Sequence, residues 1–150
     1  MSQQRNDWLA RQWRKARELS ASDWMLIVQL TGWLVVVELG LRLLPLRTLV
    51  GILQGRHRAR AANGAGVKAE HASRCVDLAA RLDPFPATCL KKSLVLYALL
   101  SRRGLAVELF IGAAKTGSKL DAHAWLECQG QVVTGGPPTE RYAPLWSLVG

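Results

Sequence analysis

Long apolar runs separated by short polar breaks predict a helical front half for this chain. Nearly every residue in the segment 24–44 is apolar. Ser20 and Asp23, just before it, have the spacing of a capping box at a helix start. Pro45 ends this helix or begins the next one, and residues 46–53 continue as a short amphipathic helix.

Polar residues inside the apolar segment argue against a membrane span. Its uninterrupted part, residues 24–37, stops at Glu38, short of the roughly 20 apolar residues that a span needs. Glu38 and Arg42 lie four apart, where they can pair on one helix face. We therefore favour a helix packed on the protein core or a partner. Peripheral membrane attachment and a true span are the alternatives.

A basic stretch that contains glycine, residues 54–66, is the predicted linker. It separates an N-terminal apolar helical segment, residues 1–55, from a second domain, residues 67–150. The chain therefore divides into a helical front part and a part that carries the chemistry described below.

Residues 67–82, after the linker, predict a helix with one apolar face. That face carries His71, Cys75, Leu78 and Leu82. His71 and Cys75 have the spacing of two metal ligands on a helix, but the sequence offers no further convergent ligands. We interpret the face as a stripe directed at the core, and we predict neither a metal site nor a cofactor.

The pattern then changes from helix to strand. Residues 90–103 predict a buried helix that ends at Gly104, a natural left-handed cap. Three alternating segments follow, at residues 106–111, 120–128 and 131–134. A loop at residues 115–119 separates the first two, and the turn Gln129-Gly130 separates the last two. Helices followed by an antiparallel meander predict an α+β fold.

Composition narrows the class of protein without identifying it. The chain has 150 residues, is 49% hydrophobic and carries a net charge of +9, which excludes a disordered protein and indicates an anionic partner, whether polyanion, membrane surface or acidic peptide. Nucleic acid is not expected, because no aromatic-basic motif or zinc spacing is present. Three cysteines without a CxxC pair, and no evident signal peptide, predict a reducing cytoplasm.

Cys89 is the first candidate for chemistry. Thr88 is a plausible N-cap, which puts Cys89 in the first helical turn, where the helix terminus favours a thiolate. Lys91 and Lys92 add positive charge, and the free backbone N–H groups of that turn could hold an oxyanion. The alternative is a buried structural cysteine.

His123 is the second candidate, because it lies on a predicted strand with two distinct faces. One face carries Asp121, His123, Trp125 and Glu127, and the other carries Ala122, Ala124, Leu126 and Cys128. The second face suits the core, so Cys128, like Cys75, is interpreted as structural. A strand histidine that faces a cysteine at a helix start can take its proton. A structural histidine is the alternative.

These residues together resemble the lasso-peptide biosynthesis B2 proteins, leader peptidases of the transglutaminase-like, papain-type cysteine-protease superfamily. The resemblance covers roughly residues 24–146 and rests on residues 88–90, 93–94, 99–100, 102–104, 111–112, 123–127 and 141–145. It implies a helix that bears the nucleophile, packed on a small antiparallel sheet. It also implies hydrolysis of the bond between leader and core, with Cys89 attacking, His123 acting as general base and then acid, and the Cys89 amide holding the oxyanion.

The sequence departs from that family at the third member of the triad. The family has an Asp about a dozen residues after the histidine, whereas residues 132–136 here contain no carboxylate. We therefore predict a Cys-His dyad or incomplete triad, with Asp121 as a candidate orienter of His123. A carbonyl or a water molecule could hold the imidazole instead.

The resemblance also implies partners: a precursor leader peptide, a leader-recognition (B1-type) protein and the lasso cyclase. Peripheral membrane contact is left open. Two other functions fit the residues. One is an acyltransferase using the same Cys89 and His123, and the other is a non-catalytic, membrane-associated scaffold of the maturation complex.

Overall fold

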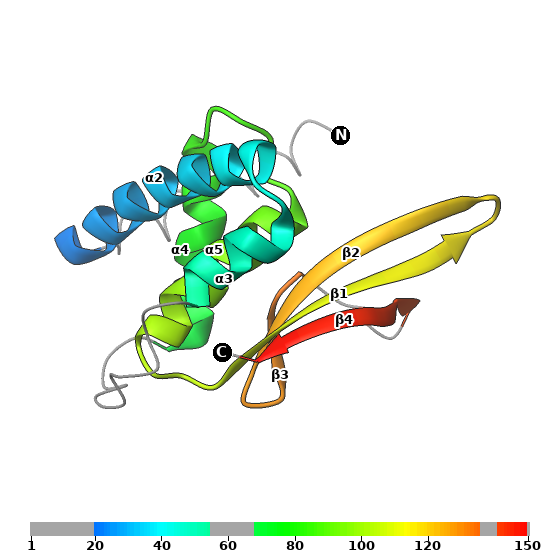
Figure 1. Cartoon of the computed structure of the whole chain (residues 1–150). Coiled ribbons are helices and arrows are strands. Elements are labelled where there is room, and N and C mark those ends of the chain that lie inside the picture. The colour runs from blue at the N-terminus through cyan, green and yellow to red at the C-terminus, as the bar shows by residue number, and fades with distance from the viewer. Residues whose placement is uncertain (1–19, 55–67, 136–140, 150) are drawn as a thin grey trace, which may run out of the picture.

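The computed structural model describes residues 20–54, 68–135 and 141–149. Within these ranges, four helices gather on one side of a four-stranded antiparallel sheet (Figure 1). This arrangement confirms the α+β class predicted from the sequence. The predicted linker falls largely on residues 55–67, which lie outside the described residues.

Helix α2, Ala21–Leu43, begins at the predicted capping box. The Ser20 side chain accepts a hydrogen bond from the Asp23 amide, and the Asp23 carboxylate accepts one from the Ser20 amide at 2.9 Å. The next helix, α3, spans Leu46–Gln54 and starts directly after Pro45. Both predicted helices are confirmed to within a few residues.

One face of α2 lies in the core and the other faces outward. The buried face consists of Ile27, Leu30, Leu34 and Val37. The outward face exposes Trp24, Met25, Val28, Val36, Leu39 and Leu43. By length and composition α2 could cross a membrane. This is only weak evidence for a membrane span, because core helices of soluble proteins pass the same test. The buried face agrees with the favoured interpretation of a core helix.

Helices α4, Ala69–Leu82, and α5, Cys89–Arg102, complete the helical layer. α5 is the central helix, and every residue from Ser93 to Leu100 is buried. Two residues after its end, Gly104 has a φ of 75°, the left-handed conformation expected just beyond a helix C-terminus. The polar start of α5 therefore lies at the edge of a helix that is otherwise core.

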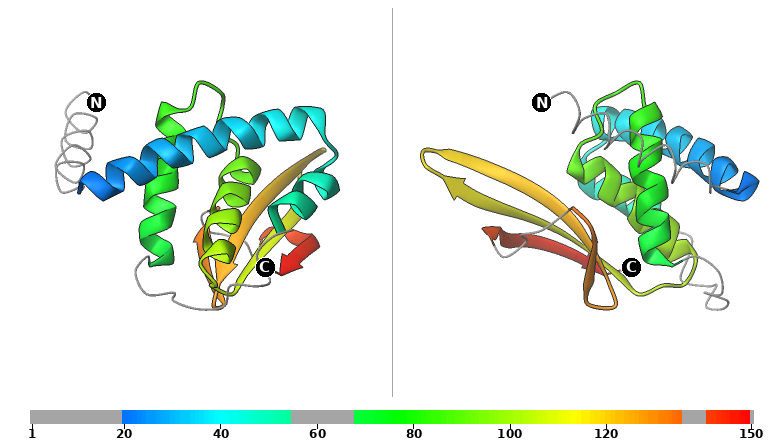
Figure 2. Two further views of the ribbon diagram at one scale, coloured as in Figure 1. Left: turned by 60° about the vertical axis from the view of Figure 1, so that its left-hand side comes forward. Right: turned by 180° about the vertical axis from the view of Figure 1, so that it is seen from behind.

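The sheet consists of β1, Val107–Thr116, β2, Lys119–Cys128, β3, Gln131–Thr134, and β4, Ala143–Val149, in the order β3-β2-β1-β4. The β1–β2 hairpin is longer than predicted, and its far half extends beyond the helices (Figure 2). Gln129 and Gly130 both have positive φ, as the predicted two-residue turn requires. The sequence did not predict β4, which pairs with β1 on the other side from β2.

A single hydrophobic core joins the helices to the sheet. It contains buried side chains from α2, α3, α4 and α5 together with Val107, Leu109, Leu126 and Cys128 of the sheet. The front helices therefore pack on the same core as the helix that begins at Cys89.

Candidate active site

Cys89 is the first residue of α5, and its N-cap is Thr88 as predicted. The Thr88 hydroxyl accepts a hydrogen bond from the Lys91 amide at 3.3 Å, and the Thr88 carbonyl accepts one from the Lys92 amide. Within the described residues, the amides of Cys89 and Leu90 have no hydrogen-bond acceptor. These two donors, at the positive end of the helix dipole, can hold a developing oxyanion.

The three cysteines differ in their surroundings. Cys75 and Cys128 are buried, whereas Cys89 is half-buried. Burial raises the pKa of Cys75 and of Cys128, so neither thiol ionises readily near neutral pH. Cys89 is therefore the thiol placed to act as a nucleophile.

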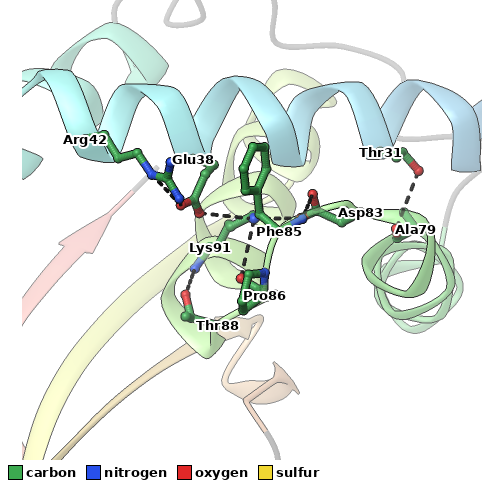
Figure 3. Close-up of polar contacts among 9 residues, drawn as sticks. All are labelled: Thr31, Glu38, Arg42, Ala79, Asp83, Phe85, Pro86, Thr88 and Lys91. Atoms are coloured by element: carbon green, nitrogen blue, oxygen red, sulfur yellow. Dashed lines mark hydrogen bonds and ion pairs between the residues drawn. The ribbon is translucent and has the colours of Figure 1, made fainter.

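Lys91 and Lys92 were expected to add positive charge beside Cys89, and this expectation is wrong because both lysines pair with carboxylates. Lys91 is completely buried, and its Nζ lies 2.6 Å from Asp83 Oδ2 and 3.1 Å from Glu38 Oε2 (Figure 3). Lys92 pairs with Asp77 at 3.0 Å. The two lysines face carboxylates rather than Cys89, so their charges are not directed at its thiol.

The buried Lys91 fixes the turn that leads into Cys89. Its Nζ also lies 3.5 Å from the Pro86 carbonyl and 5.6 Å from the centre of the Phe85 ring. The Phe85 amide in turn donates to Asp83 Oδ1 at 3.1 Å. Since Glu38 belongs to α2, this cluster of charges fastens α2 to the start of α5 (Figure 3).

His123 lies on β2 opposite Gly112 of β1, and a backbone group holds its ring. The imidazole Nε2 is 2.6 Å from the carbonyl oxygen of Gly135. A carbonyl oxygen only accepts hydrogen bonds, so Nε2 must be the donor and the neutral ring must carry its proton there. That tautomer leaves Nδ1 with a free lone pair, which is the state a general base needs.

Gly135 is suited to this contact by having no side chain. Its φ is +101°, and an added Cβ would lie 2.6 Å from Cβ of Trp125 and 2.9 Å from the carbonyl oxygen of Ala124. Both the backbone conformation and the close approach therefore require glycine. Gly135 follows His123 by twelve residues, which is where the family that the sequence resembles carries its Asp.

Gly135→Ala is expected to move the carbonyl away from His123. The added methyl cannot fit without shifting the backbone, and the strained φ should cost about 1–3 kcal/mol of folding stability. Nitrogen NMR of isotope-labelled histidine would show whether the proton of His123 is still fixed on Nε2. Gly130→Ala is the control, because its φ is also positive but nothing lies within 4 Å of its added Cβ. An unchanged His123 tautomer in a folded Gly135→Ala protein would contradict the assigned role of the carbonyl.

Tyr142 lies against the ring of His123. The two rings stack with their centres 4.8 Å apart, and the Tyr142 hydroxyl donates to Asp121 Oδ2 at 2.8 Å. The hydrogen bond to Asp121 is the main cause that raises the pKa of Tyr142, and the nearby Cys89 adds to it. Tyr142 thus has His123 against its ring and Asp121 on its hydroxyl.

Asp121, the predicted orienter, reaches His123 only indirectly. Its carboxylate contacts Tyr142 and lies 3.5 Å from Arg141. Among the described residues, no hydrogen bond joins it to the imidazole. The contact that links Asp121 to His123 is the Tyr142 side chain, and the role of Asp121 as orienter stays a prediction.

A contact between α5 and β2 brings the two candidate residues to the same region. Ser93, one helical turn after Cys89, donates to the carbonyl of Ala124, the neighbour of His123, at 3.3 Å. In the described part of the chain no hydrogen bond joins the Cys89 thiol to His123. Catalytic hydrogen bonds often form fully only when substrate is bound.

The sequence did not indicate two of the groups around His123, the Gly135 carbonyl and the Tyr142 ring. It did place Trp125, whose ring centre lies 6.2 Å from that of His123, on the same strand face. The sequence signal for Gly135 is its position, twelve residues after His123. At that position the sequence shows only that no carboxylate is present. Tyr142 lies in the segment 141–145 that contributed to the resemblance, but nothing in its sequence context indicated stacking.

Comparison with known families agrees with this geometry. A family model described as the transglutaminase-like superfamily matches residues 32–147, a range that includes the second half of α2 together with Cys89, His123 and Gly135. Searches of curated proteins and of solved structures return no match.

Proposed function

The chain belongs to the transglutaminase-like superfamily, and from that membership we propose that it is a cysteine endopeptidase. Its proposed substrate is a ribosomally made lasso-peptide precursor, cleaved between leader and core. The observation that supports the proposal is that a cysteine at a helix start occurs together with a histidine whose tautomer suits a general base. Cys89 begins α5, and His123 is held with Nδ1 free by the carbonyl of Gly135.

The proposed reaction uses these groups in sequence. His123 Nδ1 takes the proton of the Cys89 thiol, and the thiolate attacks the scissile carbonyl. The free amides of Cys89 and Leu90 stabilise the oxyanion. The imidazolium then gives its proton to the leaving amine, and water, activated by His123, hydrolyses the thioester. Because the third partner is a neutral carbonyl, it orients the ring but adds no negative charge to stabilise the imidazolium.

Two features support the choice of substrate. Residues 88–90 and 123–127 resemble the lasso-peptide leader peptidases, and the net charge of +9 favours an acidic peptide or partner. The proposed partners are the leader peptide, a leader-recognition protein and the lasso cyclase. We propose a cytoplasmic location. The exposed apolar face of α2 would also allow the protein to contact a membrane surface there.

The test is incubation of the purified protein with the precursor peptide from its genomic neighbourhood. Mass spectrometry reads the products with and without the leader-recognition protein. The expected product is a free leader acid together with the released core. Absence of cleavage in every combination, with folded protein and an intact precursor, would contradict the proposal and favour the scaffold.

An added amine separates hydrolysis from acyl transfer, because both reactions begin with the same thioester. A hydrolase yields the free acid whether or not the amine is present. A product that carries the amine at the leader carboxyl would instead establish an acyltransferase that uses Cys89.

A further inference from the structure

A second cluster of reactive side chains lies away from Cys89, between the first turn of α2 and helix α4. His71 Nε2 is 2.9 Å from Asp23 Oδ1 and 3.6 Å from Cys75 Sγ. The three ligand atoms all lie within 4.8 Å of one another. His71 and Cys75 have the sequence spacing of two metal ligands on a helix, and the fold adds Asp23 from a distant part of the chain as a third.

Each of the three side chains is held in place by its surroundings. Cys75 is completely buried, and the i, i+4 spacing in α4 puts His71 beside it. The other carboxylate oxygen of Asp23 accepts hydrogen bonds from the amide and hydroxyl of Ser20. The capping box therefore orients the carboxylate through Oδ2 and leaves Oδ1 to bind a metal ion. Outer hydrogen bonds orient the ligands of known metal sites in the same way.

We propose that Asp23, His71 and Cys75 bind a divalent zinc-class ion. Zinc takes carboxylate, imidazole and thiolate ligands at about 2.0–2.3 Å, and the observed separations of 2.9 and 3.6 Å suit ligands that share one ion. One carboxylate and one thiolate balance its charge. Asp23 and His71 are partly exposed, so the fourth position is open to water.

Binding rearranges protons in a defined way. The Cys75 thiol loses its proton to solvent, and His71 adopts the tautomer with its proton on Nδ1 so that Nε2 can bind the ion. The His71–Asp23 hydrogen bond is replaced by two bonds to the metal. The ion thereby fastens the first turn of α2 to α4, at a place that does not include Cys89 or His123.

The test uses cobalt(II) as a spectroscopic substitute for zinc in the full chain. The parent protein for the test carries Cys89→Ala, because Cys89 and His123 form another thiol–imidazole pair that could bind the ion. We expect absorption from thiolate-to-cobalt charge transfer, displaced by zinc. Adding Cys75→Ala should abolish it, and adding His71→Gln should weaken binding at least tenfold. Adding Cys128→Ala, which removes another buried thiol, should change neither.

Thermal unfolding provides the second measurement, because an ion that binds only the folded state raises the melting temperature. Zinc should raise the melting temperature of the parent and of its Cys128→Ala variant equally, and that of the His71→Gln variant by clearly less. His71 is partly exposed, so this variant tests the proposal even if Cys75→Ala does not fold. Absence of charge transfer in the parent, or equal binding in the parent and the His71→Gln variant, overturns the proposal. Neither readout depends on peptidase activity.

Discussion

Cys89→Ala is expected to reduce leader cleavage by at least about a thousandfold, the scale of loss when a nucleophile is removed from such a site. The remaining amides at the start of α5 can still bind an oxyanion, but no thioester can form without the thiol. The measurement is the rate of appearance of free leader, by mass spectrometry, at a fixed concentration of precursor and leader-recognition protein. Thr88 should still cap α5, so the folded structure is expected to persist.

Cys128→Ala is the matched control for this experiment. It removes a thiol of the same size from the core face of β2, where the thiol contributes to packing and not to chemistry. It should keep most of the cleavage rate with a slightly lower melting temperature. Equal rates in the wild type and a folded Cys89→Ala protein would contradict the proposed peptidase mechanism, because the activity would then not need the nucleophile.

Lys91→Ala is expected to produce the largest loss of stability, about 3–5 kcal/mol. Lys91 and the Asp83 carboxylate are both completely buried, and Glu38 shares the same ammonium group. Removing the lysine leaves the charge of Asp83 buried without compensation. Chemical denaturation, compared at pH 7 between the variant and the wild type, measures this loss as a difference in the free energy of unfolding.

Lys92→Ala is a sharp control, because Lys92 is the next residue of the same helix and also pairs with a carboxylate. Its partner Asp77 is about half exposed, so this pair should contribute no more than about 1 kcal/mol. The double variant Lys91→Ala with Asp83→Asn should regain part of the lost stability. Similar losses for Lys91→Ala and Lys92→Ala would contradict the role of the buried cluster.

The same cluster predicts how stability responds to acid. The hydrogen bond from Lys91 is the main cause that lowers the pKa of Glu38 below its usual 4.5. A carboxyl whose pKa is lower in the folded state stabilises the fold above the unfolded value and loses that contribution as the pH falls through the folded value. Glu38→Gln should therefore flatten the fall in melting temperature below about pH 4.5, measured against the wild type.

Local sequence signals predicted the parts of this fold that depend on neighbouring residues. The capping box at Ser20, the N-cap at Thr88 and the left-handed Gly104 are each determined within one helical turn, and the structure has all three. The i, i+4 pair of Glu38 and Arg42 also forms, at 2.8 Å. In these places a few adjacent side chains and the backbone settle the conformation.

Contacts between distant segments could not be predicted in the same way. Lys91 looked like an exposed charge at a helix start, because nothing nearby in the sequence shows that Glu38 of α2 folds over it. Strand β4 begins with three exposed residues that include Pro144, and only Trp146 and Leu148 turn inward, so its alternation is too short to predict a strand. The partner of His123 is a backbone carbonyl, which every residue has and which therefore leaves no mark of residue type.

Holding the histidine through the main chain has a genetic consequence. An Asp in that place could be lost through a single exchange of side chain, and its own ionisation would add a limb to the pH–rate curve. The Gly135 carbonyl neither titrates nor disappears on substitution. In a complete scan of single substitutions, the third member of this site should therefore appear only as intolerance of every side chain at position 135.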